Sequence, residues 1–366
     1  MPNEKKRILL LGDARQVHLK RWSRFLIDRD YDVMTLSLEP TNDIPGNHRQ
    51  LRIPKLLPDF VRYPMALPAV RRIIHRFRPD LVNAHFTPNY GVIAAMSGFR
   101  PWVLSTWGSD IMVLPQRSSF HMKRTRFVVS RATFITSDAQ VMSDRLIALG
   151  AEQERVLTFP FGVDRDVFSP VVDSNRTDGP RVLSNRKIEP VYNIDIIVSA
   201  FSEVTRSLPD ARLTVAGSGS LLKKLRREAQ RSEAARSVEF VGEVLHARVP
   251  GLLREHDLFV SIAKSDTTSV SLLEAMACGV FPIVSDIPAN REWIRHGENG
   301  YVVPPSDARA LARAIVDAWA DPQLRDSAKK QNADLIAARA DWYQNMSVVE
   351  GLFERLTQRN PGSPNS

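Results

Sequence analysis

Apolar runs of strand length alternate with helical patterns along almost the whole chain. In the first half these runs are rich in Val, Ile, Leu and aromatic residues, and the segments between them repeat apolar residues with helical spacing. This alternation is typical of βαβ units, in which helices cover both faces of a parallel sheet. The predicted strands of this first series are residues 7–12, 32–38, 81–86, 102–107, 134–137 and 156–159.

A second series of the same kind follows. Between the two series, residues 169–180 have no periodicity and are rich in Pro, Ser, Asn and Asp, which predicts a linker. We therefore expect an α/β protein with two doubly wound domains, residues 1–168 and 181–340. The predicted strands of the second series are residues 181–184, 212–216, 238–241, 258–262, 281–285 and 301–303.

The end of the chain changes from alternating to helical patterns. After Asp307 only helical spacing remains, and residues 341–357 carry apolar side chains on one face of a predicted helix. Such a face must pack against another part of the protein. Residues 358–366 are dominated by Pro, Gly, Ser and Asn, and we expect them to form a disordered tail.

The composition is that of a globular protein. Hydrophobic residues make up 43% of the 366 residues and charged residues 25%, which excludes a disordered or fibrous chain. No apolar run approaches the length of about 18 residues that crosses a bilayer, and the run behind Lys5, Lys6 and Arg7 is too short for a signal peptide. The single cysteine, Cys278, has no partner for a disulfide, and no Cys/His cluster has metal-ligand spacing. We therefore expect a cytoplasmic protein without a structural metal.

The charge is concentrated in the first half of the chain. Residues 1–170 hold 25 Lys and Arg and 16 Asp and Glu, and they account for the whole net charge of +9. The cations cluster in three segments with helical spacing, 20–24, 71–78 and 123–131. A basic surface of this kind attracts anionic lipid, nucleic acid or a phosphorylated substrate, although a solvated helix face explains the count equally well.

The most informative stretch is a polar turn and helix in the second half of the chain. The first-turn N–H groups of this helix have no partners within it, so Ser269, Val270 and Ser271 can hold a phosphate through their backbone amides. Glu274 lies one turn further in and leans back toward the same space, where it can accept hydrogen bonds from ligand hydroxyls. Asp266 faces this space from the end of the preceding strand. The plainer alternative is that Asp266 and the Thr and Ser residues after it only cap the helix.

This stretch resembles the donor-binding half of the family 4 glycosyltransferases of the GT-B fold. That family is marked by two acidic residues with seven residues between them, followed by Ala-Met-Ala-x-Gly; here these are Asp266, Glu274 and residues 275–279. The resemblance extends over nearly the whole chain. It includes the glycine turn 216–219, the segment 240–243, the segment 161–170 before the linker, and Gly12, Asp13, His18, Arg21 and Trp22 near the N-terminus.

The resemblance implies a fold and an activity. The GT-B fold has two Rossmann-like domains that face an interdomain cleft, and its C-terminal helix, here residues 341–357, crosses back to pack on the first domain. Family members are retaining glycosyltransferases. The resemblance therefore implies transfer of a sugar from a nucleoside-diphosphate-sugar donor to a saccharide or lipid-linked acceptor, in cell-envelope or exopolysaccharide biosynthesis. It implies no metal and no cofactor besides the nucleotide sugar.

The resemblance also assigns the donor site. In the family the first acid contacts the transferred sugar and the second holds the ribose; these roles fall to Asp266, one methylene shorter than the usual Glu, and to Glu274. Arg186 matches an arginine that neutralises charge on the departing diphosphate. Tyr192 stands near the place of the family's lysine, and Lys187 is a candidate substitute. The other predicted donor-binding residues are Gly217, Gly219, Val241, Glu243, Thr268, Ser269, Val270 and Ser271.

The acceptor side is assigned to loops that follow strands of the first domain. His85 matches the family's His-bearing segment and is a candidate catalytic residue, although a single histidine at a strand end is more often structural. Trp107 replaces a histidine often found in the family, and Asp110 can orient an acceptor hydroxyl. The remaining predicted acceptor-binding residues are Gly12, Asp13 and His18.

The family's simplest mechanism is a front-face transfer in which the departing diphosphate takes the acceptor proton. This agrees with the sequence, which offers no pair of carboxylates and no triad that can be assigned as acid and base. Two alternatives are an epimerase of the same fold and a non-catalytic protein that binds a sugar nucleotide or nucleic acid. We expect no nucleic acid, because Trp22 and Phe25 fit a buried helix face better than an exposed stacking surface.

The basic first half predicts peripheral contact with an anionic membrane surface, at the inner face of the cytoplasmic membrane. The sequence does not distinguish UDP, GDP and other donors, nor does it identify the acceptor, the linkage or the oligomeric state.

Overall fold

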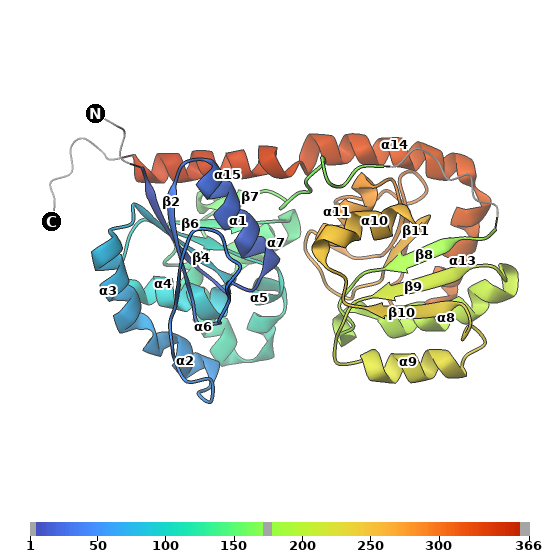
Figure 1. Cartoon of the computed structure of the whole chain (residues 1–366), viewed down its shortest axis with the longest axis horizontal. Coiled ribbons are helices and arrows are strands. Elements are labelled where there is room, and N and C mark those ends of the chain that lie inside the picture. The colour runs from blue at the N-terminus through green and yellow to red at the C-terminus, as the bar shows by residue number, and fades with distance from the viewer. Residues whose placement is uncertain (1–4, 171–177, 359–366) are drawn as a thin grey trace. The chain divides into compact units, whose positions relative to one another are not determined.

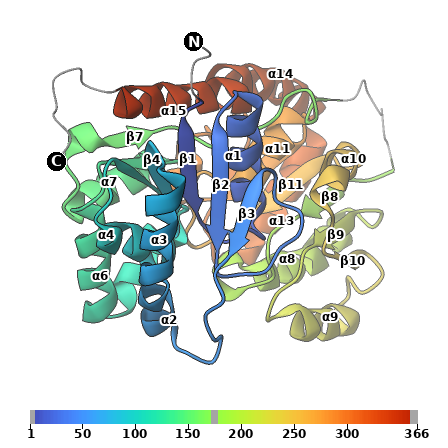
Figure 2. The same cartoon turned by 60° about the vertical axis from the view of Figure 1, so that its left-hand side comes forward.

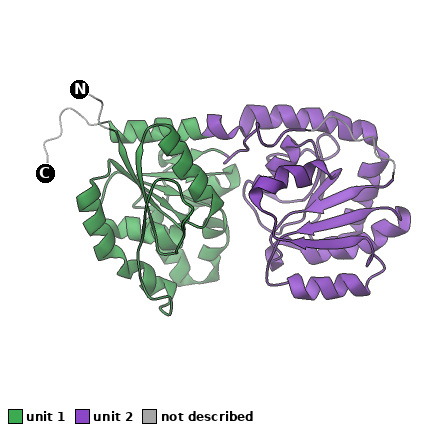
Figure 3. Ribbon diagram, in the orientation of Figure 1, with its two compact units in different colours: residues 1–159, 346–366 green, residues 160–345 purple. Residues whose placement is uncertain are grey.

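The computed structural model describes residues 5–170 and 178–358 and divides the chain into two compact units (Figure 3). Unit 1 contains residues 1–159 and 346–366, and unit 2 contains residues 160–345. Each unit is built around one parallel sheet with helices against it (Figure 1). The predicted α/β class with two Rossmann-like domains is confirmed.

The sheet of unit 1 has seven strands in the order β3-β2-β1-β4-β5-β6-β7, and all neighbouring pairs are parallel. Because the order reverses beside β1, the sheet is doubly wound and its ligand-binding edge lies at the carboxyl ends of the strands. Figure 2 shows β3, β2 and β1 side by side. The strands are β1 (Arg7–Leu11), β2 (Asp32–Ser37), β3 (Asn47–Gln50), β4 (Leu81–His85), β5 (Trp102–Ser105), β6 (Phe134–Ser137) and β7 (Val156–Thr158).

The helices of unit 1 connect these strands. One of them is a π-helix, Phe86–Gly91, which follows β4 directly, and a short 3-10 helix, Leu114–Arg117, precedes α6. The α-helices are α1 (Val17–Asp28), α2 (Asp59–Met65), α3 (Leu67–Phe77), α4 (Val92–Ser97), α5 (Ser109–Met112), α6 (Ser119–Val129) and α7 (Gln140–Ala148).

The strands of unit 1 are buried on both faces, which explains why they read as continuous apolar runs. In β1, Leu9 and Leu11 belong to the large core cluster on one face, whereas Ile8 and Leu10 point to the other face and are equally buried. That second face also buries Trp22 of α1, which is 0% exposed.

The C-terminal helix α15 (Trp342–Thr357) covers part of unit 1. From Met346 onward the chain belongs to this unit, and the ring of Phe353 lies 6.2 Å from that of Trp22. Met346, Val349 and Phe353 are completely buried. The predicted return of the terminal helix to the first domain is therefore confirmed.

The sheet of unit 2 has six parallel strands in the order β10-β9-β8-β11-β12-β13. Val260 of β11 points into one core cluster and Phe259 into another, so this sheet too is covered on both faces. The strands are β8 (Arg181–Ser184), β9 (Arg212–Ala216), β10 (Val238–Gly242), β11 (Leu258–Ser261), β12 (Phe281–Ser285) and β13 (Tyr301–Val303). The α-helices are α8 (Ile194–Ser207), α9 (Leu222–Arg231), α10 (Val249–Arg254), α11 (Val270–Ala277), α12 (Pro288–Arg291), α13 (Ala308–Ala320) and α14 (Pro322–Arg339).

The structure differs from the sequence-based expectation in one strand. The edge strand β3 was not predicted, because its sequence Asn-His-Arg-Gln has no apolar residue and only its backbone pairs with β2. Predicted strand ends otherwise agree with the structure to within two residues.

The boundary between the units also differs from the expected one. Residues 160–168 belong to unit 2 rather than to the first domain. The cause is local: the N–H of Val163 donates to the carbonyl of Ala340, the N–H of Trp342 donates to the carbonyl of Val163, and Phe168 is buried in a core cluster of unit 2. Most of the predicted linker (171–177) and nearly all of the predicted tail (359–366) lie outside the described residues.

Candidate functional site

Arg186 forms hydrogen bonds with three other predicted donor-site residues of unit 2. It follows the carboxyl end of β8, and its Nη2 lies 2.5 Å from Oδ2 of Asp266. Its Nη1 donates to Oγ of Ser271 at 2.8 Å and to Oγ of Ser269 at 2.5 Å. The side chains of Arg186 and Asp266 are only 10% and 17% exposed. The structure therefore brings a shielded cation, a carboxylate and two hydroxyls together beside the start of α11.

Tyr192 supports this cation from the side. It ends the short 3-10 helix Pro190–Tyr192, and the Arg186 guanidinium lies 4.5 Å from the centre of its ring. A cation over an aromatic face is attracted by the ring quadrupole. The tyrosine that stands near the place of the family's lysine therefore orients Arg186 instead of adding a second charge.

The glycine turn after β9 packs against the backbone that carries Arg186. Gly217 has φ +153°, and a Cβ there would collide with the carbonyl oxygen of Arg186. A Cβ at Gly219 would collide with the carbonyl oxygen of Ile188, which already accepts a hydrogen bond from Leu221. Both predicted glycines are therefore required by close backbone approach. Their role in this structure is to position the Arg186 segment.

The start of α11 agrees with the prediction from sequence. Ser269 is the N-cap, with extended backbone, and its Oγ accepts from the N–H of Leu272. Thr268 is 4% exposed, while Val270 and Ser271 in the first turn are partly accessible. The first-turn N–H groups of a helix lack partners within it, and this first turn lies beside Arg186, which donates to Ser269 and Ser271. The combination suits a phosphate or diphosphate group.

Glu274 has a partner that the sequence analysis missed. Its carboxylate is buried within α11, and Oε1 lies 2.8 Å from Nε2 of His246. The His246 ring also packs against Phe168, with 5.5 Å between ring centres. The sequence signal was weak, since His246 is a single histidine a few residues beyond β10.

Three other predicted donor-site residues lie outside this contact network. Lys187 is exposed, whereas its neighbour Arg186 is shielded, as expected for adjacent residues that point in opposite directions. Val241 is 41% exposed at the end of β10. Glu243 is exposed as well and accepts from Oγ of Ser218 at 3.4 Å. These side chains are accessible, but no contact links them to Arg186.

On the predicted acceptor side of unit 1, the side chain of Trp107 contacts two histidines, His85 and His18. Its indole N–H donates to Nδ1 of His85 at 3.3 Å, and its ring lies 5.6 Å from that of His18 in an edge-on arrangement. His85 is 1% exposed, and burial, together with the charge of His18, lowers its pKa to about 3. Burial and the Trp107 contact hold His85 as a neutral imidazole at the end of β4, and its catalytic role stays a prediction.

Asp110 is also buried and differs from the expectation that it meets an acceptor hydroxyl. It is 0% exposed; Oδ2 accepts from the N–H and Oγ1 of Thr87, and Oδ1 accepts from the N–H of Trp107. Burial raises its pKa, and these three donors oppose that shift. Asp110 therefore fixes the loops after β4 and β5 instead of facing solvent.

Gly12 and Asp13 lie at the carboxyl end of β1. A Cβ at Gly12 would lie 2.7 Å from Cδ2 of Leu19 in α1, so a larger residue there would require the Leu19 side chain to shift. Asp13 is partly exposed and forms a forked ion pair with Arg15, at 2.9 and 2.8 Å. Burial acts to raise the pKa of Asp13, but the Arg15 contacts outweigh it and the pKa is lowered. Asp13 is therefore a stable carboxylate at the sheet edge where ligands bind in doubly wound folds.

Two further observations concern membrane spans and metal ligands. Among the described residues, no helix combines the length and the apolar character needed to cross a bilayer. Within residues 5–170 and 178–358, no three His, Cys, Asp or Glu side chains are grouped so that they could hold a metal ion.

Comparison with protein families gives two matches that together cover well over half of the chain. Residues 170–334 match the family model described as "Glycosyl transferases group 1", and residues 7–139 match the one described as "Glycosyl transferase 4-like". The first match contains Arg186, Asp266 and Glu274.

Similar curated proteins include mannosyltransferases. The phosphatidyl-myo-inositol mannosyltransferase of Mycolicibacterium smegmatis is 28% identical over 220 residues, which is 59% of this chain and 54% of that protein. A GDP-mannose-dependent alpha-(1-6)-phosphatidylinositol monomannoside mannosyltransferase from the same organism is 26% identical over 252 residues, 64% of each chain. The matches thus span less than two thirds of these relatives' lengths.

Solved structures with the same fold match over nearly their whole length. Sucrose-phosphate synthase from Thermosynechococcus elongatus has a TM-score of 0.84 at 18% identity, over 96% of this chain and 99% of that one. HepE from Anabaena in complex with UDP-glucose has a TM-score of 0.79 at 18% identity, over 95% and 99%. Both are glycosyltransferases of the GT-B fold. From the two family matches and this shared fold, the chain belongs to the group 1 (family 4) glycosyltransferases.

Proposed function

We propose that the protein is a retaining glycosyltransferase that transfers a sugar from a nucleoside diphosphate donor to a saccharide or lipid-linked acceptor in cell-envelope or exopolysaccharide biosynthesis. The observation that carries the proposal is the convergence of Arg186, Asp266 and the start of α11 on one place beside the buried Glu274.

Each part of this cluster has a role in donor binding. The Arg186 guanidinium and the first-turn amides of α11 compensate the charge that develops on the diphosphate as the glycosidic bond breaks. Glu274 accepts hydrogen bonds from the ribose hydroxyls, and His246 holds its carboxylate in place. Asp266 contacts hydroxyls of the transferred sugar, and its shorter side chain leaves room for a water molecule between them.

The transfer needs no protein base. The acceptor oxygen bonds to the anomeric carbon on the face from which the diphosphate departs, the bond between that carbon and the diphosphate oxygen breaks, and this oxygen takes the acceptor proton. The buried, neutral state of His85 supports this route, because an imidazole with a pKa of about 3 is a poor proton acceptor at neutral pH.

The donor is a nucleoside diphosphate hexose. A thermal-shift screen against UDP, GDP, ADP and their sugars tests this, because a ligand that binds only the folded state raises the melting temperature. We expect a shift with one nucleotide family that is lost in Glu274→Ala and kept in Glu239→Ala, an exposed glutamate of β10. A cooperatively melting protein that shifts with none of these ligands would overturn the donor assignment.

Catalysis is tested with the same donor. Transfer releases the nucleoside diphosphate, and a coupled assay detects it when candidate saccharide and lipid-linked acceptors are added. If the protein binds the nucleotide but releases no nucleoside diphosphate, neither by transfer to any acceptor nor by slow hydrolysis of the donor, a non-catalytic sugar-nucleotide-binding protein is favoured.

The reaction proceeds without a bound metal. The Arg186 cluster supplies the positive charge that a divalent cation would otherwise bring to the diphosphate. We expect EDTA to leave donor binding and transfer unchanged. Activity that EDTA removes and Mg²⁺ or Mn²⁺ restores would contradict this.

The protein works in the cytoplasm, at the inner face of the membrane, as a peripheral protein. The excess of basic residues in 1–170 supports this, as do the lipid acceptors in the names of the mannosyltransferase relatives. Sedimentation with vesicles at low salt tests the proposal. Equal recovery with neutral and anionic vesicles would contradict it.

A further inference from the structure

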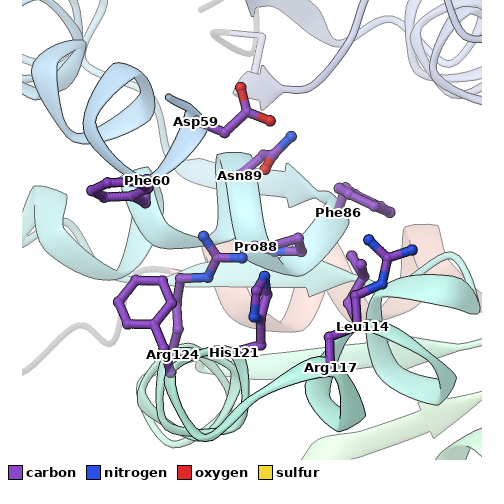
Figure 4. A pocket seen from close by; sticks show the side chains of 10 residues that line it. Asp59, Phe60, Phe86, Pro88, Asn89, Leu114, Arg117, His121 and Arg124 are labelled. Atoms are coloured by element: carbon purple, nitrogen blue, oxygen red, sulfur yellow. The ribbon is translucent and has the colours of Figure 1, made fainter. Parts of the chain in front are cut away.

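Unit 1 contains a pocket of about 590 Å³ at the carboxyl edge of its sheet (Figure 4). Its walls come from the π-helix after β4, the 3-10 helix Leu114–Arg117 after β5, the start of α6, and α2. This edge is where doubly wound sheets bind ligands. The volume lies in the range of small-molecule sites, so the pocket is large enough for a bound group and not only for solvent.

The pocket contains a cation that forms no ion pair with a described residue, and the carboxylate of Asp59 lines the same pocket. Arg124 of α6 is half-buried; its Nε is buried without a partner, and among the described residues its side chain makes neither a hydrogen bond nor an ion pair. Its guanidinium lies over the ring of Phe120, 5.4 Å from the ring centre. Burial lowers the pKa of Arg124, and the charge of Asp59 only partly opposes this shift. An anion in the pocket would relieve this desolvation cost.

A second cation faces the same space. Figure 4 shows Arg124 and His121 extending toward Pro88 and Asn89, and Arg117 extending toward Phe86. Arg117 is exposed and has no hydrogen-bond or ion-pair partner in the described part of the chain. Arginine binds phosphate oxygens with a planar, forked set of donors, and both Arg117 and Arg124 line this pocket.

The rim of the pocket is apolar and exposed. Phe60 of α2 and Phe120 of α6 are 56% and 53% exposed, and their rings meet edge to face at 6.0 Å. Exposed apolar side chains gathered beside a binding pocket mark an interaction surface. The pocket therefore offers an anion site next to an apolar surface.

The wall opposite Arg124 is held in an uncommon conformation. Phe86, the first residue of the π-helix, has φ +76°, a left-handed conformation that is strained for a bulky side chain. The next residue, Thr87, is fixed by the buried Asp110, which accepts from both its N–H and its hydroxyl. Because Asp110 also binds the N–H of Trp107, the pocket wall is tied to the predicted acceptor loop. π-Helical turns and strained residues are frequent at functional sites.

We propose that this pocket binds the phosphate of a lipid-phosphate acceptor, with Arg124 and Arg117 on the phosphate and the first carbons of the lipid against Phe60 and Phe120. The inference rests on the proposed function and narrows its acceptor to a phosphorylated lipid. A soluble phosphate ester would contact the two arginines but not the aromatic side chains of Phe60 and Phe120.

Calorimetric titration of the full-length protein tests the proposal with geranyl phosphate, geraniol and inorganic phosphate as probes. We expect geranyl phosphate to bind at least about tenfold more tightly than either of the others, because only it fills both parts of the pocket. Arg124→Gln is expected to weaken geranyl phosphate at least about tenfold. Arg126→Gln, the same charge change at an exposed position of α6, is expected to leave it unchanged.

Phe120→Ala separates the two parts of the site, since it should weaken geranyl phosphate and leave inorganic phosphate unchanged. Equal affinities for geranyl phosphate and inorganic phosphate would overturn the lipid assignment, and so would equal affinities of Arg124→Gln and the wild type. Absence of geranyl phosphate binding to the wild type would overturn the pocket itself.

The nucleotide thermal shift distinguishes this failure from that of the proposed function. Arg124 lies in unit 1 and the donor cluster in unit 2, so Arg124→Gln should keep the wild-type shift. A nucleotide shift without geranyl phosphate binding would reject only the pocket, whereas geranyl phosphate binding without any nucleotide shift would reject the glycosyltransferase proposal.

Discussion

Arg186 has its charge compensated by groups from a different segment of unit 2. Its ion pair with Asp266 and its hydrogen bonds to Ser269 and Ser271 join positions that are 80 to 85 residues apart in the sequence. Serine hydroxyls can rotate and exchange partners, so Ser269 and Ser271 can form other hydrogen bonds when the cation turns toward a diphosphate. This adaptability is what a site needs when charge appears only during the reaction.

Replacing Arg186 by lysine tests whether the fork or only the charge matters. A lysine keeps the charge but loses the planar set of donors. We expect Arg186→Lys to weaken nucleoside diphosphate binding by about 1.5 to 3 kcal/mol, measured by calorimetry. The exposed neighbour provides the comparison: Lys187→Ala should have the smaller effect, and the reverse order would assign the diphosphate to Lys187.

His246 is expected to act through Glu274. Its Nε2 holds one carboxylate oxygen at 2.8 Å, which leaves the other for the ribose. We expect His246→Ala to weaken nucleotide binding by about 1 kcal/mol, less than Glu274→Ala does. His246→Asn, which can still donate a hydrogen bond, should recover part of the loss. Stronger binding by His246→Ala would mean that the histidine competes with the nucleotide.

His85 makes stability depend on pH. Burial lowers the pKa of His85 from 6.5 to about 3. Below pH 6.5 this imidazole therefore binds a proton in the unfolded chain but stays neutral in the folded protein. The contribution of neutral His85 to the free energy of unfolding is therefore fully present above pH 6.5 and is lost as the pH falls toward 3. Within this pH range we expect the free energy of unfolding to fall by about 1.4 kcal/mol for each pH unit of acidification. In urea unfolding at pH 7 and pH 5, His85→Phe should lose less stability on acidification than the wild type; an equal loss would assign the effect elsewhere.

At the scale of the element, the turns that follow strands decide how the donor site is built. Arg186 can stand beside α11 only because the turn after β9 is narrow enough for its backbone to approach the Arg186 segment. Sequence patterns predict the strand, the turn and the helix separately. They do not predict that the turn touches the segment after β8, because that contact depends on the neighbouring order of β9 and β8 in the sheet.

Gly219→Ala tests this contact. The added Cβ would collide with the carbonyl of Ile188, so the segment after Arg186 must move. We expect loss of most nucleotide binding together with about 1 to 3 kcal/mol of stability, measured by thermal shift and urea unfolding. Gly251→Ala, in α10 with open space around it, should leave both unchanged or slightly raise stability. Wild-type nucleotide affinity in Gly219→Ala would show that the turn does not position Arg186.

The element scale also shows where pattern analysis fails. β3 is a strand because its backbone pairs with β2, and nothing in its polar side chains signals this. Asp110 shows the same limit in a loop: its position after β5 was predicted, but whether it faces solvent or lies under the loop depends on Thr87, which follows β4.

At the scale of the whole molecule, the C-terminal helix ends in the unit where the chain began. Residues from Met346 onward belong to unit 1, and Phe353 is completely buried beside Trp22. Unit 1 therefore reaches its complete fold only after α15 has been synthesised and has packed against it.

Phe353→Ala tests this dependence. Removing a fully buried ring should destabilise unit 1 by about 3 to 5 kcal/mol. In hydrogen exchange, peptides from β1 and α1 should lose protection while peptides from β8 and β11 keep it. Val348→Ala, at a half-exposed position of the same helix, is the matched control. Unchanged exchange in β1 would mean that α15 is not part of the stable core of unit 1.

From its sequence alone, this protein reveals its class of fold and most of its strands and helices, and it offers candidate donor residues in one local stretch. Apolar periodicity reports burial directly, and residues close in sequence on one helix have a fixed spacing. Which polar groups meet depends on the tertiary structure: Arg186 meets Asp266, His246 meets Glu274, Asp110 meets Thr87, and Arg124 lies over the ring of Phe120. These contacts depend on strand order and side-chain burial, which are set by the packing of the whole sheet and leave no periodic trace along the chain.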